Sequence, residues 1–334
     1  EAGGGAGDDG EPTVEAEGGE RIVERSRHGP ARIRAMKIRI GLGLGTRTQA
    51  GTPEVLGPMV EAAERLRFDS LWFSERVGGE APDPVVAMTY AIARTKKLKV
   101  GMSVMVLPGR NPVLVAKELA SLDVLSGGRL LPAFGLGVAD PHEQQAFGVK
   151  RGERAKPFDE ALDVLRKLWT GEPVTHQGEF FRFEDVRVRP KPVQDPLEVW
   201  LGGAADSELR RVGRVGDGWL PSFCTPEDVR DGRALIEEAA AGYGREIDPE
   251  HFGALIAYSD GPLPDGIVDF IAKRKPGVDP SAIIPTGLPA LKETIEKMVE
   301  VGTASKFVVL PFTEPDDWEA ELEALAAAVL PLQT

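Results

Sequence analysis

The chain has 334 residues, of which 42% are hydrophobic and 28% charged, so it can bury one large core or two modest ones. Its net charge of −13 and the lack of a basic stripe argue against nucleic acid and anionic membranes as partners, and without a run of about 18 apolar residues no membrane-spanning helix is predicted. The single cysteine, Cys224, rules out an intrachain disulfide and a cysteine-based metal cluster, which favours a cytoplasmic protein without a metal site.

The first 35 residues differ in composition from the rest of the chain. They are rich in glycine and acidic residues and then in arginine, and they show almost no apolar periodicity. Such a segment cannot form a core, and it lacks the apolar stretch of a secretory signal. The stretch MKIRIGLGLG from Met36 is typical of a natural start. We therefore expect residues 1–35 to be a disordered extension and residues 36–334 to form the folded domain.

Short apolar runs alternate with longer amphipathic stretches from Met36 onward. The predicted strands are residues 38–44, 70–73, 98–107, 129–136, 197–201, 218–221, 252–259 and 306–312. Capping residues or prolines mark the helix starts between them: Thr52 with Pro53, Asn111 with Pro112, Asp206, Thr225 with Pro226, Pro289 and Pro315. Repeated strand and helix units with nearly continuous apolar strands predict an α/β fold with a parallel sheet, a (β/α)8 TIM barrel.

Two stretches are longer than the repeating unit requires. Residues 139–152 and 171–196 form an insertion after the fourth strand, and residues 260–285 form one after the seventh. Long insertions in a compact fold are usually functional loops, so we expect both to shape the site.

Charged residues follow two of the predicted strands. Glu75 and Arg76 follow the second strand, and Asp140 and His142 follow the fourth. Because barrels of this kind collect their chemistry at the carboxyl ends of the strands, these residues are candidate site residues. An ion pair with a neighbouring loop is the alternative interpretation for each of them.

Glycine-rich turns raise the question of a nucleotide site. GLGLGT from Gly41 and GLGVAD from Gly135 both lack the third glycine of the dinucleotide fingerprint, and no Walker-type phosphate loop occurs. The stretch LGGAADSELRR, residues 201–211, places small residues directly before a helix, where backbone N–H groups can approach a phosphate. A plain tight turn explains these residues equally well.

Four stretches together are similar to a known family. They are FDSLWFSERV, NPVLVAKELASLDVLSGGRLLPAFGLG, AFGVKRGERAKPFDEALDVLRKLWTGEPVTHQGEFF and WLGGAADSELRRVGRVGDGW. In this order and spacing they resemble the luciferase-like monooxygenase superfamily, and within it the branch that uses the deazaflavin coenzyme F420. The resemblance covers about Met36 to the C-terminus and implies a (β/α)8 barrel, in agreement with the strand count.

The resemblance also implies where the cofactor binds. Its ring would lie across the barrel mouth, backed by a bulge in the third strand with a non-prolyl cis peptide, which matches Ser103 and Val104. Its phosphate tail would be held by the loops after the fourth and fifth strands. The corresponding positions are Val138, Ala139, Gly202, Gly203 and Ala204.

Relatives in this branch typically end the second strand with Asp-His, whereas this chain has Glu75 and Arg76. Glu75 keeps a carboxylate that can hydrogen-bond to the ring. Arg76 keeps its proton, so we expect it to stabilise negative charge on the reduced ring or to hold an anionic substrate. The proton is then predicted to be handled by Asp140, which matches a carboxylate position in similar enzymes, or by His142.

These residues predict an oxidoreductase that moves a hydride between coenzyme F420 and a small organic substrate. Two alternatives stay open: an FMN-dependent monooxygenase of the same fold, and a cofactor-binding protein without turnover. The missing histidine pair after the second strand argues against the first alternative, and Arg76 in place of a histidine motivates the second. The family also implies a homodimer, and the sequence does not identify the substrate.

Overall fold

The computed structural model describes residues 36–334, so the extension predicted for residues 1–35 lies outside the described residues. The parallel strands all lie inside the eight stretches that the sequence predicts. They are β1 Arg39–Leu44, β2 Ser70–Phe73, β3 Lys99–Met102, β4 Met105–Val106, β5 Leu130–Leu131, β6 Ala133–Gly135, β9 Trp200–Leu201, β10 Gly218–Trp219, β11 Gly253–Tyr258 and β12 Lys306–Pro311. The predicted strand positions are thereby confirmed.

The strands form two parallel sheets. One has the order β11-β12-β1-β2-β3-β5, and the other has the order β10-β9-β6-β4. The sheets share two of the predicted strands, because the third is interrupted at Ser103 and Val104 and the fourth at Pro132. A parallel bridge from Trp219 to Phe252 joins β10 to the start of β11. The strand order is therefore that of a (β/α)8 barrel.

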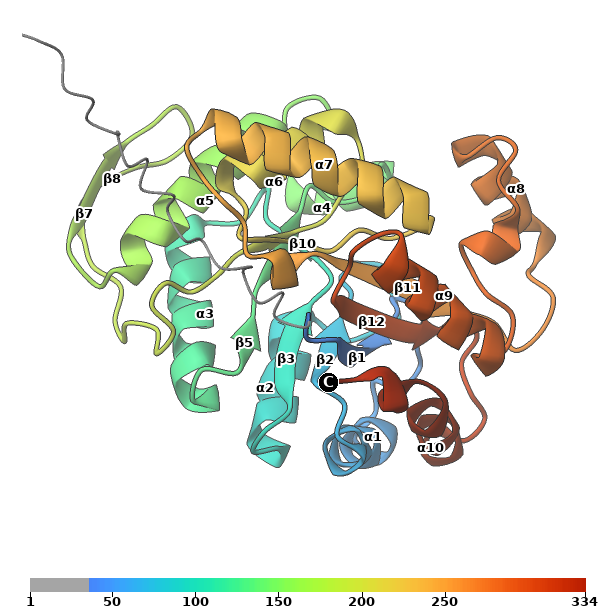
Figure 1. Cartoon of the computed structure of the whole chain (residues 1–334). Coiled ribbons are helices and arrows are strands. Elements are labelled where there is room, and N and C mark those ends of the chain that lie inside the picture. Colours follow the sequence, from blue (N-terminus) through green and yellow to red (C-terminus); the bar gives the residue numbers. More distant parts are fainter. Residues whose placement is uncertain (1–35) are drawn as a thin grey trace, which may run out of the picture. The chain divides into compact units, whose positions relative to one another are not determined.

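Helices follow the strands and lie outside them (Figure 1). They are α1 Pro53–Leu66, α2 Pro84–Arg94, α3 Pro112–Ser126, α5 Ala155–Trp169, α6 Asp206–Val215, α7 Pro226–Gly242, α9 Leu288–Glu300 and α10 Trp318–Val329. Two predicted helix starts are capped as expected: Asn111 Oδ1 accepts the N–H of Val113 at 2.9 Å, and Thr225 and Asp228 cap each other reciprocally. Thr52 precedes α1 without a side-chain capping bond, and α10 begins at Trp318, capped by Asp317, three residues after the predicted Pro315. Within residues 36–334, none of the helices is both long and apolar enough to cross a membrane.

Both predicted insertions are present (Figure 1). After β6 come helix α4, Pro141–Phe147, and, beyond α5, an antiparallel hairpin of β7, Val174–Gln177, and β8, Arg182–Val186. After β11 come helix α8, Asp265–Arg274, and a short 3-10 turn, Pro280–Ala282. The sequence analysis missed the hairpin because its residues are mostly polar and half-exposed, so no apolar run marks its strands.

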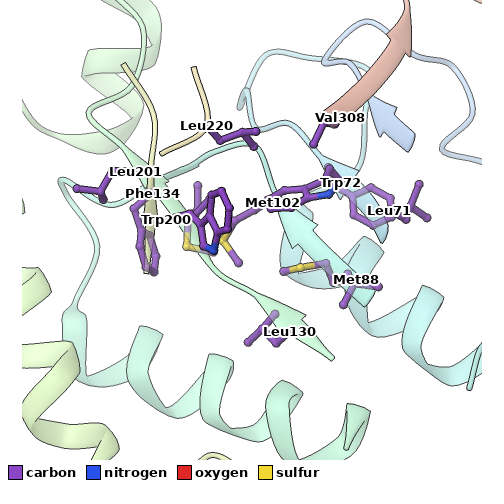
Figure 2. Packing of buried hydrophobic residues seen from close by; sticks show 14 of the residues in the cluster. Leu71, Trp72, Met88, Met102, Leu130, Phe134, Trp200, Leu201, Leu220 and Val308 are labelled. Atoms are coloured by element: carbon purple, nitrogen blue, oxygen red, sulfur yellow. The ribbon is translucent and has the colours of Figure 1, made fainter. Parts of the chain in front are cut away.

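Large side chains fill the interior of the fold (Figure 2). Trp72 of β2, Phe134 of β6 and Trp200 of β9 are at most 3% exposed. Two glycines make room for the tryptophans: a Cβ atom on Gly101 would lie 2.7 Å from the Trp72 ring, and one on Gly218 would lie 2.4 Å from the Trp200 ring. Because truncating a buried aromatic side chain typically costs about 3–5 kcal/mol, this core is a stable frame for the loops at the strand ends.

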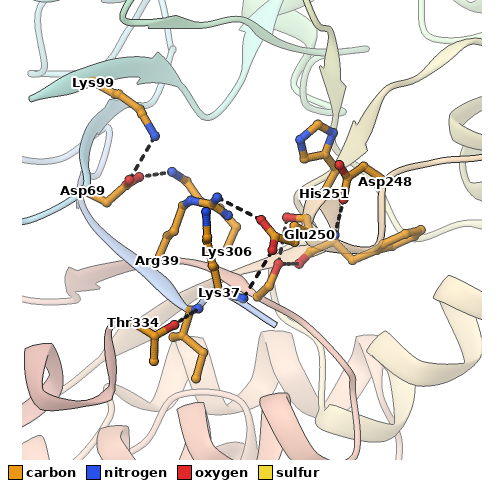
Figure 3. Close-up of polar contacts among 12 residues, drawn as sticks. Lys37, Arg39, Asp69, Lys99, Asp248, Glu250, His251, Lys306 and Thr334 are labelled. Atoms are coloured by element: carbon orange, nitrogen blue, oxygen red, sulfur yellow. Dashed lines mark hydrogen bonds and ion pairs between the residues drawn. The ribbon is translucent and has the colours of Figure 1, made fainter. Parts of the chain in front are cut away.

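Ion pairs gather at the amino-terminal ends of the strands (Figure 3). Asp69, directly before β2, accepts a hydrogen bond from Lys99 of β3 at 3.1 Å and another from Lys306 of β12. Arg39 of β1 pairs with Glu250 at 2.9 Å. Burial by itself would raise the pKa of Asp69, but the two lysines lower it to about 2. We call these five residues, Arg39, Asp69, Lys99, Glu250 and Lys306, the floor cluster.

Candidate active site

A cavity of about 680 Å³ lies at the carboxyl ends of the strands, on the face opposite the floor cluster. Residues that directly follow β1, β2, β6, β9 and β12 line it, among them Gly45, Ser74, Leu136, Gly202 and Phe312. This is the face on which parallel barrels place their chemistry, and it is the face that the sequence predicts to hold the site.

Glu75 lines the cavity with a side chain that is only 5% exposed. Its Oε2 atom accepts the Val106 N–H at 2.6 Å, and its Oε1 atom accepts a hydrogen bond from the Arg110 guanidinium. Burial raises the pKa of Glu75, although the Val106 N–H and Arg110 act in the opposite direction. Both carboxylate oxygens are therefore held in place at the edge of the cavity.

Arg76 joins the loop after β2 to the loop after β6. Its Nη2 atom donates to Asp140 Oδ2 at 2.8 Å, and its Nε atom lies 3.8 Å from Glu143 Oε1. Glu143 is buried and accepts the N–H groups of Val77 at 3.1 Å and Gly78 at 3.0 Å. Arg76 thus forms the neighbouring-loop ion pair that the sequence analysis left open, while it also lines the cavity. We call Glu75, Arg76, Arg110, Asp140 and Glu143 the mouth cluster.

Asp140 and His142 stand at the start of α4. Asp140 caps the helix, because its Oδ1 atom accepts the His142 N–H at 2.8 Å. This hydrogen bond and the Arg76 guanidinium lower the pKa of Asp140. The His142 side chain is 94% exposed, and neither residue is among those that line the cavity. Proton transfer by Asp140 or His142 stays a prediction.

Ser103 and Val104 both line the cavity, and the peptide bond between them is cis. This agrees with the bond implied by the family resemblance at the break between β3 and β4. Val104 packs closely on two glycines: a Cβ atom on Gly135 would lie 2.4 Å from a Val104 methyl group, and one on Gly202 would lie 3.2 Å from the other. Val104 thus packs between two glycines in the lining of the cavity, so a side chain at either glycine would crowd it.

The two predicted phosphate loops lie partly in the cavity. Val138, Gly202 and Gly203 line it, whereas Ala139 and Ala204 do not. Glu208 of α6 accepts the N–H groups of Ala204 and Ala205, each at 3.1 Å. The carboxylate therefore occupies backbone donors that the sequence analysis offered to a phosphate.

Several residues of the site were not found from the sequence. Arg154 donates to the carbonyl oxygens of Leu136 at 3.1 Å, Gly137 at 2.6 Å and Val138 at 3.2 Å, and so holds the loop after β6. Arg211 lines the cavity beside this loop and pairs with Asp159 at 2.7 Å. The missed residues are Arg110, Glu143, Arg154, Glu208 and Arg211.

Two features of the sequence could have pointed to some of these residues. Glu143 falls in residues 139–152, which the sequence analysis marked as a functional insertion, and both Arg154 and Arg211 fall in stretches that carry the family resemblance. Their partners lie far away in sequence, since Glu143 bonds to N–H groups 65 and 66 residues earlier. No local pattern predicts such pairs.

Solved structures share this fold. The F420-dependent tetrahydromethanopterin reductase of Methanopyrus kandleri matches with a TM-score of 0.72 at 20% identity, over 89% of this chain and all of that chain. The oxygenating constituent of 3,6-diketocamphane monooxygenase from a Pseudomonas putida plasmid, a type II Baeyer–Villiger monooxygenase solved with FMN, matches with a TM-score of 0.71 at 17% identity, over 90% of this chain and 99% of that chain. At these identities the matches confirm the predicted fold alone.

Sequence comparison points to a family. A curated relative, the F420-dependent glucose-6-phosphate dehydrogenase of Segniliparus rotundus, is 32% identical over 224 residues, which cover 63% of this chain and 66% of the relative. The chain thus matches slightly less than two thirds of that relative's length. The family description "Luciferase-like monooxygenase" matches residues 36–260, which is more than half of the chain. The chain therefore belongs to the luciferase-like monooxygenase family.

Proposed function

We propose that this protein is an oxidoreductase that uses coenzyme F420 to move a hydride to or from a small organic substrate. The observation that carries the proposal is that Ser103 and Val104, where the family resemblance places the ring, and Gly202, where it places the phosphate tail, all line one cavity of about 680 Å³ at the carboxyl ends of the strands. A curated relative of this chain is named an F420-dependent dehydrogenase, and a solved structure of the same fold is named an F420-dependent reductase.

Two groups of cavity residues suit the two parts of a deazaflavin cofactor, its ring and its phosphate tail. Ser103, Val104 and the glycines beside them would hold the ring, and the loop at Val138 with Arg154 would hold the phosphate tail, because Glu208 already occupies the N–H groups that follow Gly203. When bound, the cofactor supplies a ring carbon that accepts or gives a hydride, that is, a hydrogen nucleus with two electrons.

The protein's own residues would position and neutralise charge. Arg110 and the Val106 N–H keep the Glu75 carboxylate at the ring's edge. Arg76, the next residue, also lines the cavity, and its guanidinium would stabilise negative charge on the reduced ring. When a substrate gives up a hydride it also releases a proton, and Asp140 and His142 are the two candidates to receive it.

Ring fluorescence tests the choice of cofactor. We expect the purified protein to bind F420 saturably and FMN weakly. Tight FMN binding without F420 binding would favour the FMN-dependent monooxygenase, the alternative that the FMN-containing structural neighbour supports.

Turnover tests the alternative of a binding protein without catalysis. A panel of alcohols, sugar phosphates, imines and unsaturated carbonyl compounds is mixed with F420, and the redox state of the ring is followed. Glu75→Gln is expected to keep F420 binding and to lose turnover. If no member of the panel is converted and Glu75→Gln changes nothing, the alternative stands.

We also propose a cytoplasmic homodimer. Helix α3 supports the dimer because it exposes Leu114, Val124 and Leu125, and the Leu125 side chain is 73% exposed. The single cysteine of the chain supports a reducing compartment. Sedimentation equilibrium is expected to give twice the chain mass, and Leu125→Glu is expected to shift the protein toward the monomer.

A further inference from the structure

Two parts of the chain give the cavity chemically different linings. Its arginines, Arg47, Arg76, Arg154 and Arg211, all come from the part of the chain before residue 212. The insertion after β11, which carries α8 (Figure 1), supplies apolar side chains instead. We call the following set the apolar wall: Phe223, Ile267, Phe270, Ile283, Ile284 and Phe312.

The apolar wall is packed. Ile283 and Ile284 form a small buried cluster with Ile271, and three other members of the wall, Phe223, Ile267 and Phe312, pack against that cluster. Hydrogen bonds fix the end of the insertion on β11: the Ser259 N–H donates to the Pro285 carbonyl at 3.0 Å, and the Gly287 N–H donates to the Ser259 carbonyl at 2.7 Å. The wall therefore has a defined shape before any ligand arrives.

Two aromatic side chains of the wall come from different elements of the fold. Phe223, after β10, and Phe270, on α8, meet edge to face with ring centroids 5.6 Å apart. Phe223 holds a φ of 57°, a conformation that side chains other than glycine rarely adopt. Such backbone conformations gather at ligand sites, where the surrounding structure maintains them.

The last part of the chain adds no positive charge to the lining of the cavity. Among residues 253–318, the cavity-lining residues include one charged group, Glu314, and it is an acid. The basic residues in and after the last turn of α8, Lys273, Arg274 and Lys275, do not line the cavity, and Lys275 pairs with Asp228 at 2.6 Å. The six side chains of the apolar wall offer a phosphate dianion no cation or hydrogen-bond donor in exchange for its lost hydration.

We infer that the substrate is a neutral, apolar organic compound whose aromatic or branched hydrocarbon group packs against the apolar wall. The inference rests on the proposed function, because Arg76 and the loop at Val138 in the same cavity are assigned to the cofactor. It separates this chain from the relative that is named a glucose-6-phosphate dehydrogenase, whose named substrate carries a phosphate.

Ligand binding tests the inference separately from the proposed function. Saturation-transfer-difference NMR is recorded on the full chain with acetophenone, a neutral aryl ketone, and with glucose 6-phosphate, each with and without F420. We expect saturable transfer to the acetophenone ring and none to glucose 6-phosphate. Acetophenone binding without any F420 binding would contradict the proposed function and still support the apolar ligand site. F420 binding with transfer to glucose 6-phosphate alone, or to neither probe, would overturn the inference and keep the proposed function.

Variants on α8 locate the binding. Phe270 is 43% exposed, so Phe270→Arg is expected to fold, and it should weaken acetophenone binding about five- to ten-fold because a charged, hydrated group replaces an apolar one in the wall. Ala272→Arg adds the same charge to an exposed position of the same helix that does not line the cavity, and it should leave the affinity unchanged. Phe270→Leu should stay within about two-fold of the unmodified chain. Equal affinities for all three variants would overturn the inference.

Discussion

Strand β2 carries an acid near each end, and the two acids behave differently. Asp69 precedes the strand and lies between two lysines of the floor cluster, which lower its pKa to about 2. Glu75 follows the strand and lines the cavity, and burial raises its pKa. Both acids have a cationic partner, so an ion pair by itself says nothing about function. The direction of the strand decides which acid faces the cavity, and three measurements can break or sharpen this comparison.

The largest expected effect is on the floor. Asp69→Ala would leave Lys306, which is 3% exposed, without its carboxylate partner. Removing one member of a buried ion pair typically lowers the free energy of unfolding by about 3–5 kcal/mol. Urea unfolding of the unmodified chain and of Asp69→Ala measures this loss of unfolding free energy. The control is Asp163→Ala, which removes an exposed pair with Lys167 and should change the free energy of unfolding by about 0.5 kcal/mol or less. A loss below about 1 kcal/mol for Asp69→Ala would contradict the structural role of the floor cluster.

The next effect is the opposite pH dependence of the two acids. A pKa lowered from 3.8 to about 2 means that Asp69 contributes about 2 kcal/mol of stability above pH 3.8, which is lost as the pH falls toward 2. The raised pKa of Glu75 works the other way, since its contribution is present below its ordinary value of 4.5 and is lost as the pH rises through the raised value.

Unfolding free energies measured across this pH range check both signs. The difference between the unmodified chain and Asp69→Asn should shrink as the medium becomes acidic. As the pH rises above 4.5, the unmodified chain should lose stability relative to Glu75→Gln. The same trend in both variants would remove the contrast between the two ends of β2.

The smallest effect on stability is expected at the mouth. The Arg76 and Asp140 side chains are each more than a third exposed, so Arg76→Met should change the free energy of unfolding by less than about 1 kcal/mol. F420-dependent turnover should fall about 10²-fold, because a cation that stabilises charge on the reduced ring is lost. Urea unfolding and turnover are measured on the same preparation. A loss of several kcal/mol in the free energy of unfolding with unchanged turnover would show that Arg76 has a structural role like that of the floor cluster.

The fold was largely predictable because its signals are local. Apolar runs such as Ser70–Phe73 mark buried strands, and pairs such as Asn111 with Pro112 mark helix starts that the structure then shows capped. The β7 and β8 hairpin was not predictable in this way, since half-exposed polar strands leave no apolar run. Its pairing depends on two segments that meet after folding.

The candidate site was predictable in position but not in partners. Glu75 and Arg76 line the cavity, as their place after the second strand predicts, and so do Ser103 and Val104, which the family resemblance indicated. His142 follows the same rule of position, yet its side chain is 94% exposed, because the capping geometry of α4 sets its direction. Position along a strand predicts which face a residue reaches, and it does not predict where the side chain points.

The sequence by itself determined the eight strand stretches, the two insertions and the family, since periodicity, capping and motif order are properties of neighbouring residues. The tertiary structure alone decided that Arg110 holds Glu75 from 35 residues away, that Glu143 holds the loop after β2 from 65 residues away, and that Phe223 meets Phe270 in the apolar wall. The physical reason is that a parallel barrel brings the ends of distant strands to one face, and the contacts made there depend on the whole arrangement of strands.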